Sequence, residues 1–285
     1  MRSVTRRQVL RTAGGVALGA LARPALAQGG GEGLLARLQA AKKVRVGIAN
    51  QPPYSALNPD GSITGAAPEI SKVIMGRLGI TEIEALIGNY GELIPGMLAG
   101  RWDFVSAALT ITAARCGQVL FADPLLFDGT AIVYLKGSTS LSPKSIADLA
   151  KANVTVALQA GGATFRTTLG LGVPLANIRQ FNDDPAILDG VLAGRAQFGI
   201  MSWSPLRNLI KQRNLDVSVF YPVPDDPPRG ASCAFRPGDT DLQEAYNKEL
   251  RAMKASGEYL DIIRKFGFDT PPELINVTYE QACKP

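Results

Sequence analysis

Two stretches of this chain, far apart along the sequence, repeat one short pattern. Met-Leu-Ala-Gly-Arg-Trp-Asp-Phe at 97–104 returns as Val-Leu-Ala-Gly-Arg-Ala-Gln-Phe at 191–198, and each copy ends a helical pattern and opens an apolar strand. Each copy also follows an earlier strand start, at 44–49 and at 154–158. The matched places of the two copies predict two similar βαβ lobes, and therefore an α/β protein.

The rest of the sequence predicts the elements that connect these lobes. Short apolar runs bounded by turn residues at 129–135 and 231–235 predict two strands, which we expect to be the crossings between the lobes. Helical apolar spacing over 241–265, broken near Gly257, predicts two helices that pack back on the first lobe. The predicted organisation is lobe 1 over 41–130, lobe 2 with the hinge strands over 131–235, and a return to lobe 1 over 236–285. Two lobes joined in this way leave a cleft that can close on a small ligand.

Residues 1–27 have the pattern of an export leader. Thr-Arg-Arg-Gln-Val-Leu at 5–10 matches a twin-arginine signal peptide, a short apolar stretch follows, and Ala-Leu-Ala at 25–27 is a cleavage site. The apolar stretch is too short to span a bilayer, so we expect export to the periplasm by the twin-arginine route, with 28–40 as a linker. The leader holds five arginines and no acid, so the formal charge of +5 falls to zero without it. The charge therefore indicates no nucleic-acid partner.

The chain has no histidine, which excludes Ser-His-Asp and Cys-His chemistry and histidine metal ligands. Its three cysteines, Cys116, Cys233 and Cys283, lack metal-ligand spacing, and we expect no metal and no cofactor. In an oxidising compartment a Cys116–Cys283 disulfide would close the C-terminal tail onto the first lobe and leave Cys233 buried. The spacing alone does not choose among the three pairings.

One arginine stands where α/β sheets bind their ligands. The pattern from Tyr90 onward predicts a helix, a tight turn at Gly100, a buried strand from Phe104 to Ala108 and a polar loop that holds Arg115. Ligands bind beyond the carboxyl ends of the strands in such sheets, and a guanidinium offers a planar fork of donors that matches a carboxylate. We therefore expect Arg115 to anchor an anionic group.

A series of motifs in order carries a family resemblance, from Lys43 to the end of the chain. They are Pro-Pro-Tyr at 52–54, Gly-Ala-Ala-Pro-Glu-Ile at 65–70, Leu-Ile-Pro at 93–95, Ala-Gly-Arg-Trp-Asp-Phe at 99–104, Ile111-Thr112 to Arg115, and Phe-Ala-Asp-Pro at 121–124. This sequence resembles the amino-acid class of extracytoplasmic solute-binding proteins that feed ABC transporters, family 3. Within that class Ile-Thr-Glu-Ile at 80–83, Ala-Arg-Cys-Gly-Gln-Val at 114–119, Pro-Arg-Gly at 228–230, Phe-Gly-Phe at 266–268 and Cys283 are most similar to ectoine and hydroxyectoine-binding proteins.

The resemblance implies a type II periplasmic-binding-protein fold and a set of ligand-binding residues. Arg115 would grip the ligand carboxylate with help from Thr110, and Tyr54 and Tyr90 would line the wall of the first lobe. In the second lobe, the resemblance implies a loop at Gly161 and Gly162 that closes on the carboxylate, and it places Ser202 where most members have an aspartate for an α-ammonium.

Three positions depart from the ectoine-binding pattern: Gln51 replaces an acid expected to hold the amidinium, Thr110 an aromatic, and Gly162 a hydroxyl. Because Ser202 supplies no carboxylate, and a buried ammonium needs one, we expect a ligand without a plain primary ammonium. Tyr54, Tyr90 and Trp203, if they converge, would offer aromatic faces to a diffuse cation. Ectoine and betaines fit this description, and an amino-acid derivative stays open.

The function implied is that of a monomeric periplasmic binding protein that closes on a small zwitterion and hands it to an ABC permease, without catalysis. One alternative is an enzyme on the same fold, similar to cyclohexadienyl or arogenate dehydratases. Such an enzyme needs a general acid in the cleft, whereas Gln51, Thr110 and Ser202 do not titrate usefully. Another alternative is a ligand-sensing module that presents its closed form to a receptor.

Overall fold

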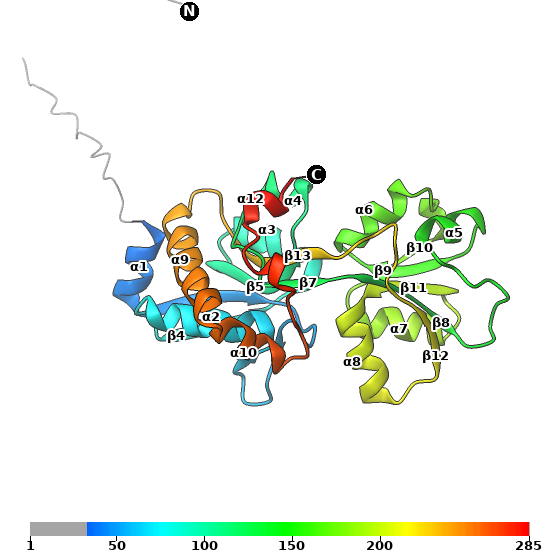
Figure 1. Ribbon diagram of the computed structural model, residues 1–285, viewed down its shortest axis with the longest axis horizontal. Coiled ribbons are helices and arrows are strands. Elements are labelled where there is room, and N and C mark those ends of the chain that lie inside the picture. The colour runs from blue at the N-terminus through cyan, green and yellow to red at the C-terminus, as the bar shows by residue number, and fades with distance from the viewer. Residues whose placement is uncertain (1–32, 285) are drawn as a thin grey trace, which may run out of the picture. The chain divides into compact units, whose positions relative to one another are not determined.

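The computed structural model describes residues 33–284, and two β-sheets organise this part of the chain into two lobes (Figure 1). The first sheet has the strand order β4-β1-β5-β13-β6, with β7 also paired to β13. The second has the order β10-β9-β11-β8-β12. The strands of the first sheet are β1 (Lys43–Ile48), β4 (Glu82–Ile87), β5 (Phe104–Thr110), β6 (Leu120–Phe121), β7 (Leu126–Asp128) and β13 (Arg229–Phe235), and those of the second are β8 (Thr130–Leu135), β9 (Val156–Gln159), β10 (Ile178–Phe181), β11 (Phe198–Ser202) and β12 (Val217–Phe220).

The two sheets share one topology. In the first, β1 runs parallel to β4 and to β5, and β13 runs antiparallel to β5. In the second, β9 runs parallel to β10 and to β11, and β8 runs antiparallel to β11. The prediction of two similar α/β lobes is confirmed, and the repeated glycines Gly100 and Gly194 both have positive φ, 75° and 71°, after their helices.

Both faces of each sheet are covered. In β5, Phe104 and Ala108 face one apolar cluster of the first lobe, while Val105, Ala107 and Leu109 face the other. Burial on both faces explains why this strand is an almost continuous apolar run. The covering helices of the first lobe are α1 (Leu34–Ala41), α2 (Ala66–Arg77), α3 (Leu93–Leu98), α9 (Thr240–Ser256) and α10 (Glu258–Arg264), and those of the second are α5 (Ile146–Lys151), α6 (Ala163–Gly170), α7 (Asp184–Leu192) and α8 (Trp203–Arg213).

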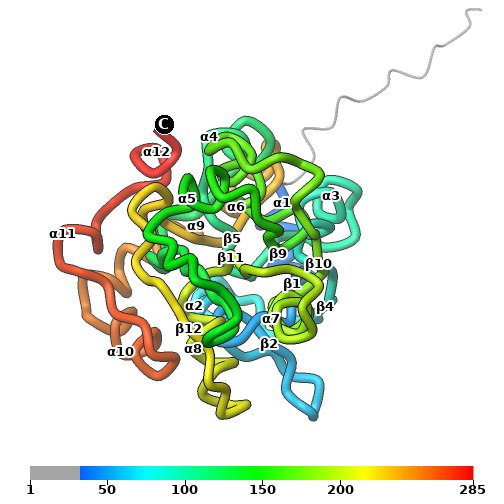
Figure 2. Tube along the Cα trace, turned by 90° about the vertical axis from the view of Figure 1, so that its right-hand side faces the viewer, coloured from blue at the N-terminus to red at the C-terminus, as the bar shows by residue number. Residues whose placement is uncertain are grey.

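Shorter elements complete the first lobe. A two-stranded hairpin joins β2 (Ala56–Leu57) to β3 (Ile63–Thr64), and short 3₁₀ turns lie at Tyr90–Glu92 in this lobe and at Leu175–Asn177 in the second. The helices α4 (Ala113–Cys116), α11 (Pro272–Ile275) and α12 (Tyr279–Ala282) lie outside the two sheets. Figure 2, viewed with the second lobe toward the reader, shows α12 and the C-terminus at the edge of the molecule, beside α4.

Two crossings connect the lobes, but one strand lies elsewhere than predicted. β7 pairs within the first sheet, and after Gly129 the chain continues as β8 in the second sheet. The second crossing follows β12 and ends at Arg229, because β13 pairs along its whole length with β5, β6 and β7 of the first sheet. The predicted end of lobe 2 at 235 is therefore wrong, since the backbone pairing assigns 229–235 to lobe 1.

The prediction of an N-terminal linker over 28–40 is also wrong in its second half. Residues Leu34–Ala41 form α1, whose Leu34 and Leu38 are buried in the core of the first lobe. The amide of Leu35 donates to the Asp241 carboxylate on α9 at 2.8 Å. The signal-peptide prediction falls outside the described residues. Among residues 33–284, no helix has both the length and the apolar character that crossing a membrane would require.

The C-terminal segment packs on the first lobe as expected. α9 and α10 meet at Gly257, which has φ 84° and interrupts the helical pattern there. A disulfide joins Cys116 on α4 to Cys283, with a Cα separation of 6.0 Å. Cys233 is buried beside the hydroxyls of Ser71, Ser106 and Tyr246. The structure thus contains the pairing named from the sequence, and it ties the tail to the helix that carries Arg115.

The close fit of Trp102 in the first lobe gives a stability test. Its indole donates to the carbonyl of Leu93 at 3.0 Å, and a Cβ added to Gly96 would lie 2.4 Å from its ring. We expect Gly96→Ala to lower the free energy of unfolding by about 1–3 kcal/mol, because an overpacked core must shift. The measurement is urea unfolding of the purified protein.

The matched control is Gly76→Ala. Gly76 lies in exposed α2 backbone, and no heavy atom lies within 4 Å of the added Cβ, so this change should stabilise by about 0.5–1 kcal/mol through helix propensity. Equal effects of the two substitutions would contradict the packing described for Trp102.

Candidate ligand-binding site between the lobes

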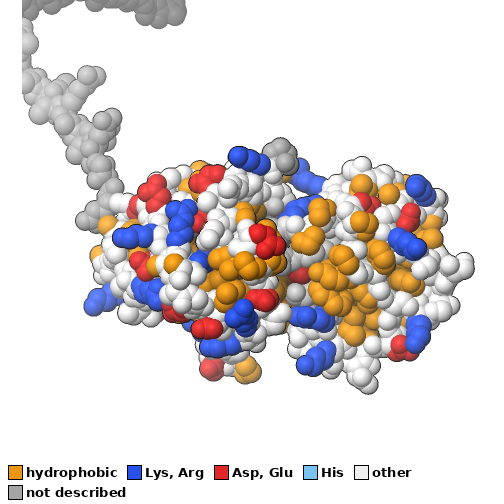
Figure 3. Space-filling view, viewed as in Figure 1, with side chains coloured by type: hydrophobic (Ala, Val, Ile, Leu, Met, Phe, Trp, Pro, Cys, Tyr) orange, Lys and Arg blue, Asp and Glu red, His pale blue; other side chains and the backbone are white. Residues whose placement is uncertain are grey.

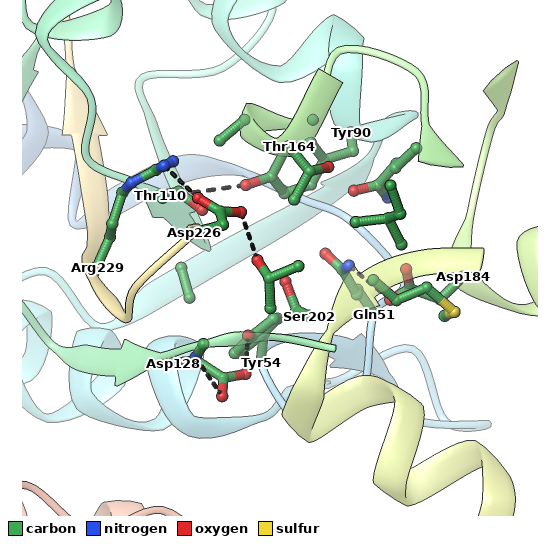
Figure 4. A pocket seen from close by; sticks show the side chains of 18 of the residues that line it. Gln51, Tyr54, Tyr90, Thr110, Asp128, Thr164, Asp184, Ser202, Asp226 and Arg229 are labelled. Atoms are coloured by element: carbon green, nitrogen blue, oxygen red, sulfur yellow. Dashed lines mark hydrogen bonds and ion pairs between the residues drawn. The ribbon is translucent and has the colours of Figure 1, made fainter. Parts of the chain in front are cut away.

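A small cavity lies between the carboxyl ends of the strands of the two sheets (Figure 4). Its volume is about 40 Å³, which is room for a few water molecules. Both lobes supply its walls. The polar side chains that line it are Gln51, Tyr54, Tyr90, Thr110, Asp128, Thr130, Gln159, Thr164, Asp184, Ser202, Asp226 and Arg229.

The inner wall of the cavity holds a pair of residues from opposite lobes. Gln51 follows β1 of the first lobe and is 6% exposed, while Asp184 begins α7 of the second lobe and is 4% exposed. The side-chain nitrogen of Gln51, Nε2, donates to the Asp184 carboxylate at 2.6 Å. The side-chain oxygen of Gln51, Oε1, is buried without a partner among the described residues. Burial raises the pKa of Asp184 to about 6, although the hydrogen bond from Gln51 opposes this shift.

A second carboxylate stands at the first crossing. Asp128 accepts hydrogen bonds from the Tyr54 hydroxyl, from the amide of Ser204 at 3.0 Å and from the amide of Gly129 at 3.0 Å. Tyr54 belongs to the first lobe and Ser204 to the first turn of α8, so Asp128 joins both lobes at the hinge. Burial raises the pKa of Asp128, and the Tyr54 hydrogen bond acts in the opposite direction.

The third carboxylate lies at the second crossing. Asp226 is 2% exposed, accepts from the Thr130 hydroxyl at 2.6 Å and forms an ion pair with Arg229. Arg229 also donates to the Thr167 hydroxyl on α6 at 3.1 Å. Burial raises the pKa of Asp226, while Thr130 and Arg229 oppose the rise. The cavity walls therefore carry three carboxylates and, among the described residues that line it, one cation.

A larger groove adjoins the cavity and has the opposite charge. It measures about 880 Å³ and runs between α3 and α4 of the first lobe and α6 of the second. Its charged lining residues are Arg115, Arg166, Arg229 and Lys284, and none of the described residues that line it is acidic. The groove and the cavity share Tyr90, Gly162, Ala163 and Arg229 as lining residues. Figure 3 shows the narrow waist between the lobes on one face of the molecule, with charges of both signs scattered over both lobes.

Arg115 lies in this groove, in contact with both lobes. Its Nη1 donates to the Thr110 carbonyl at 2.8 Å and approaches the Tyr90 hydroxyl at 3.5 Å, and its Nη2 donates to the Gly161 carbonyl at 2.9 Å. The guanidinium also lies 5.4 Å from the centre of the Tyr90 ring. A guanidinium has five N–H groups, so these contacts leave donors for an anion in the groove.

Two glycine backbones meet where the lobes touch. A Cβ on Gly161 would lie 2.4 Å from the Cα of Gly91 in the first lobe, and Gly161 has φ 72°. A side chain at Gly161 therefore does not fit against Gly91. The contact brings the loop before α6 against the turn that carries Tyr90.

The structure brings together most of the residues named from the sequence, but in two places. Those that line the cavity are Gln51, Tyr54, Tyr90, Thr110, Gly162 and Ser202, whereas Arg115 and Gly161 line only the groove. Trp203 lines neither, and instead stacks on Tyr221 with ring centres 4.6 Å apart. The predicted convergence of three aromatic faces thus reduces to Tyr54 and Tyr90.

The carboxylates of the cavity were not among the residues expected from the sequence. Gln51, Thr110 and Ser202 supply no carboxylate, but Asp128 and Asp184 line the cavity, so the cleft does hold acids that could face a cation or titrate. Asp184 follows β10 after only two residues. The rule that singled out Arg115, a polar residue just beyond the carboxyl end of a parallel strand, could have found it.

Two lobes, two crossings and a ligand-sized cleft between strand ends define the class of two-lobed periplasmic binding proteins. Residues 44–269 match the bacterial extracellular solute-binding proteins, family 3, and the chain belongs to this family. A protein of Sinorhizobium fredii with the name "Probable amino-acid ABC transporter periplasmic-binding protein" is 26% identical over 85% of this chain and 82% of its own.

Two solved structures resemble this chain in fold and sequence. The crystal structure of EhuB in complex with hydroxyectoine has a TM-score of 0.83 and 33% identity, and the match covers 88% of this chain and 98% of that chain. The ancestral amino acid-binding protein AncCDT-1, a precursor of cyclohexadienyl dehydratase, has a TM-score of 0.72 and 28% identity over 82% of this chain and 99% of that chain. Both likenesses support the family assignment of residues 44–269.

The raised pKa of Asp184 predicts a pH-dependent stability. An acid with a folded-state pKa near 6 and an ordinary value of 3.8 contributes its full stability below pH 3.8 and loses it as the pH rises through 6. Without ligand, Asp184→Asn should therefore be more stable than the wild type by up to roughly 3 kcal/mol at pH 7.5, with the difference vanishing near pH 4. Urea unfolding from pH 4 to 8 measures it.

Asp189→Asn is the control, since Asp189 lies on the same helix and pairs with Arg213 at the surface. Its effect should stay within about 0.5 kcal/mol at each pH. An Asp184→Asn curve that runs parallel to the wild-type curve would show that the carboxylate is not buried in solution.

Proposed function

We propose that this protein captures a small zwitterion for an ABC importer, with the solute carboxylate in the basic groove and the solute cation in the acidic cavity. The observation that carries the proposal is the opposite charge of two adjoining spaces. Arg115, Arg166, Arg229 and Lys284 line the groove, and three carboxylates line the cavity. Electrostatic complementarity of this kind selects a solute with charges of both signs and orients it.

Shared walls allow one molecule to reach both charges. Tyr90 and Gly162 line the cavity and the groove alike, so a solute beside them lies between Arg115 and the carboxylates. The Tyr90 ring already faces the Arg115 guanidinium. This supports the role of Tyr90 and Tyr54 as walls and that of Arg115 as the carboxylate anchor, with Thr110 and the Gly161–Gly162 loop beside it.

Contacts between the lobes support capture by closure. Three hydrogen bonds join groups of different lobes. They are the Gln51–Asp184 bond, the Arg115 bond to the Gly161 carbonyl and the bond from the Ser204 amide to Asp128. A ligand favours the closed form only through contacts that the open form lacks. A solute that touches Arg115 on one lobe and Asp184 on the other meets this condition.

The ligand class follows from the same two charges. Ectoine and hydroxyectoine each join a carboxylate to a delocalised amidinium, and EhuB has been solved with hydroxyectoine. Ser202 at the cavity wall does not exclude an amino-acid derivative, because Asp184 supplies a carboxylate. We propose an ectoine-like solute or such a derivative as the ligand, a membrane permease as the partner, a monomer as the working unit and the twin-arginine route for export.

An enzyme remains the second candidate, and one observation favours it. Asp184 has the raised pKa that a general acid needs. Its only described hydrogen-bond partner is the side chain of Gln51, and no described histidine, metal cluster or second activated group accompanies it. The relatives that are named as binding proteins favour binding without turnover.

Replacement of Arg115 tests the proposed carboxylate anchor. Arg115→Ala should weaken hydroxyectoine binding about tenfold to a hundredfold, since a hydrogen bond to a charged group contributes about 1.5–3 kcal/mol. Isothermal calorimetry measures the Kd. Arg195→Ala is the control, because Arg195 is an exposed arginine of the second lobe and lines neither space. A Kd for Arg115→Ala within threefold of the wild type would remove Arg115 as the anchor.

The enzyme candidate predicts turnover that the binding protein should not show. We expect no product from prephenate or arogenate above the uncatalysed rate, followed by liquid chromatography over hours at micromolar protein. Turnover that disappears in Asp184→Asn would instead assign this protein to catalysis.

A further inference from the structure

Asp184 is buried, but it neither caps a helix nor forms an ion pair with a described residue. The N-terminus of α7 is capped by its neighbour Asp183, whose side chain accepts from the amide of Ala186 at 2.8 Å. Among the described residues, no cation forms an ion pair with Asp184, and its side-chain partner is Gln51. A buried carboxylate without a cation is unfavourable for the folded protein, so its position in the cavity wall indicates a ligand.

Gln51 points to the same ligand independently. Its backbone is held by a hydrogen bond from its amide to the Ser55 carbonyl at 2.8 Å, and its side-chain nitrogen is used by Asp184. Its side-chain oxygen, in a residue 94% buried, has no partner among the described residues and lies at the cavity (Figure 4). An unpaired buried acceptor requires a donor.

The chemistry of the pair defines what it can bind. A carboxylate and an amide oxygen are both acceptors, so a cation that satisfies them must carry N–H groups. Amidinium, guanidinium and ammonium groups carry them, whereas the quaternary ammonium of a betaine does not. A quaternary cation would leave the Gln51 oxygen desolvated and unpaired.

We propose that Gln51 and Asp184 form the cation subsite of the cleft and restrict the solute to cations with N–H donors, which excludes betaines. The proposal rests on the function proposed above and narrows it. The acid that relatives are expected to place at position 51 or 202 is here supplied from α7 at position 184. Because Gln51 belongs to one lobe and Asp184 to the other, the subsite is complete only when the lobes are closed.

A fragment titration tests the subsite without a zwitterion. Formamidinium chloride carries N–H donors and tetramethylammonium chloride does not, and both are small cations. We expect the side-chain amide signal of Gln51, assigned by its loss in Gln51→Leu, to shift saturably with formamidinium and not with tetramethylammonium at equal ionic strength. Equal responses to the two salts, or no saturable response to formamidinium, would overturn the proposal.

Two matched variants test whether formamidinium binds at Asp184. Asp184→Asn should weaken formamidinium binding at least tenfold, whereas Asp189→Asn, on the same helix at the surface, should leave it unchanged. The comparison of the two salts is made on the wild type and does not depend on Asp184→Asn, so it stays decisive if that variant does not fold. An unchanged formamidinium response in folded Asp184→Asn would refute the role of Asp184.

Calorimetry with hydroxyectoine and glycine betaine separates this proposal from the function on which it rests. We expect hydroxyectoine to bind about tenfold to a hundredfold more tightly. Equal binding of both would overturn the N–H restriction and leave the zwitterion-binding function standing. Binding of formamidinium but of neither zwitterion would support the subsite and overturn the proposed ligand class.

Discussion

A carboxylate buried between two sheets, with an amide and no cation as its partner, is the interaction on which the cleft depends. Asp184 gains its position from α7, and α7 from the β10 end of the second sheet. Desolvation of this carboxylate lowers the stability of the folded protein. The apolar clusters on both faces of each sheet supply the stability that offsets it. A cation that enters the cavity would relieve that cost, which couples recognition of the solute to the stability of the closed form.

The lobes themselves were predictable because their pattern is local and repeated. The Leu-Ala-Gly-Arg motif at 98–101 and 192–195 marks a helix end and a strand start in each half, and both follow from short-range spacing. The boundary at 229–235 could not be predicted, since pairing of β13 with β5 depends on contacts more than a hundred residues apart. Helix α1 was missed because its short apolar stripe gains stability from packing on α9 rather than from its own sequence.

The site was predictable in part for the same reason. Tyr54, Tyr90 and Gln51 follow recognisable motifs, and the structure brings them to one cavity. The sequence could not show that Trp203 turns toward Tyr221, because side-chain direction after β11 depends on the neighbouring crossing. Asp184 does follow the carboxyl end of β10 along the sequence, but that Asp184 and Ser202 line one space depends on the fold, because they belong to different elements.

The contact of Gly91 with Gly161 limits how closely the two lobes approach each other. Main chain meets main chain there, and a Cβ at Gly161 would lie 2.4 Å from the Cα of Gly91. These two segments therefore cannot approach each other more closely, and a side chain at Gly161 would hold the lobes further apart at this point.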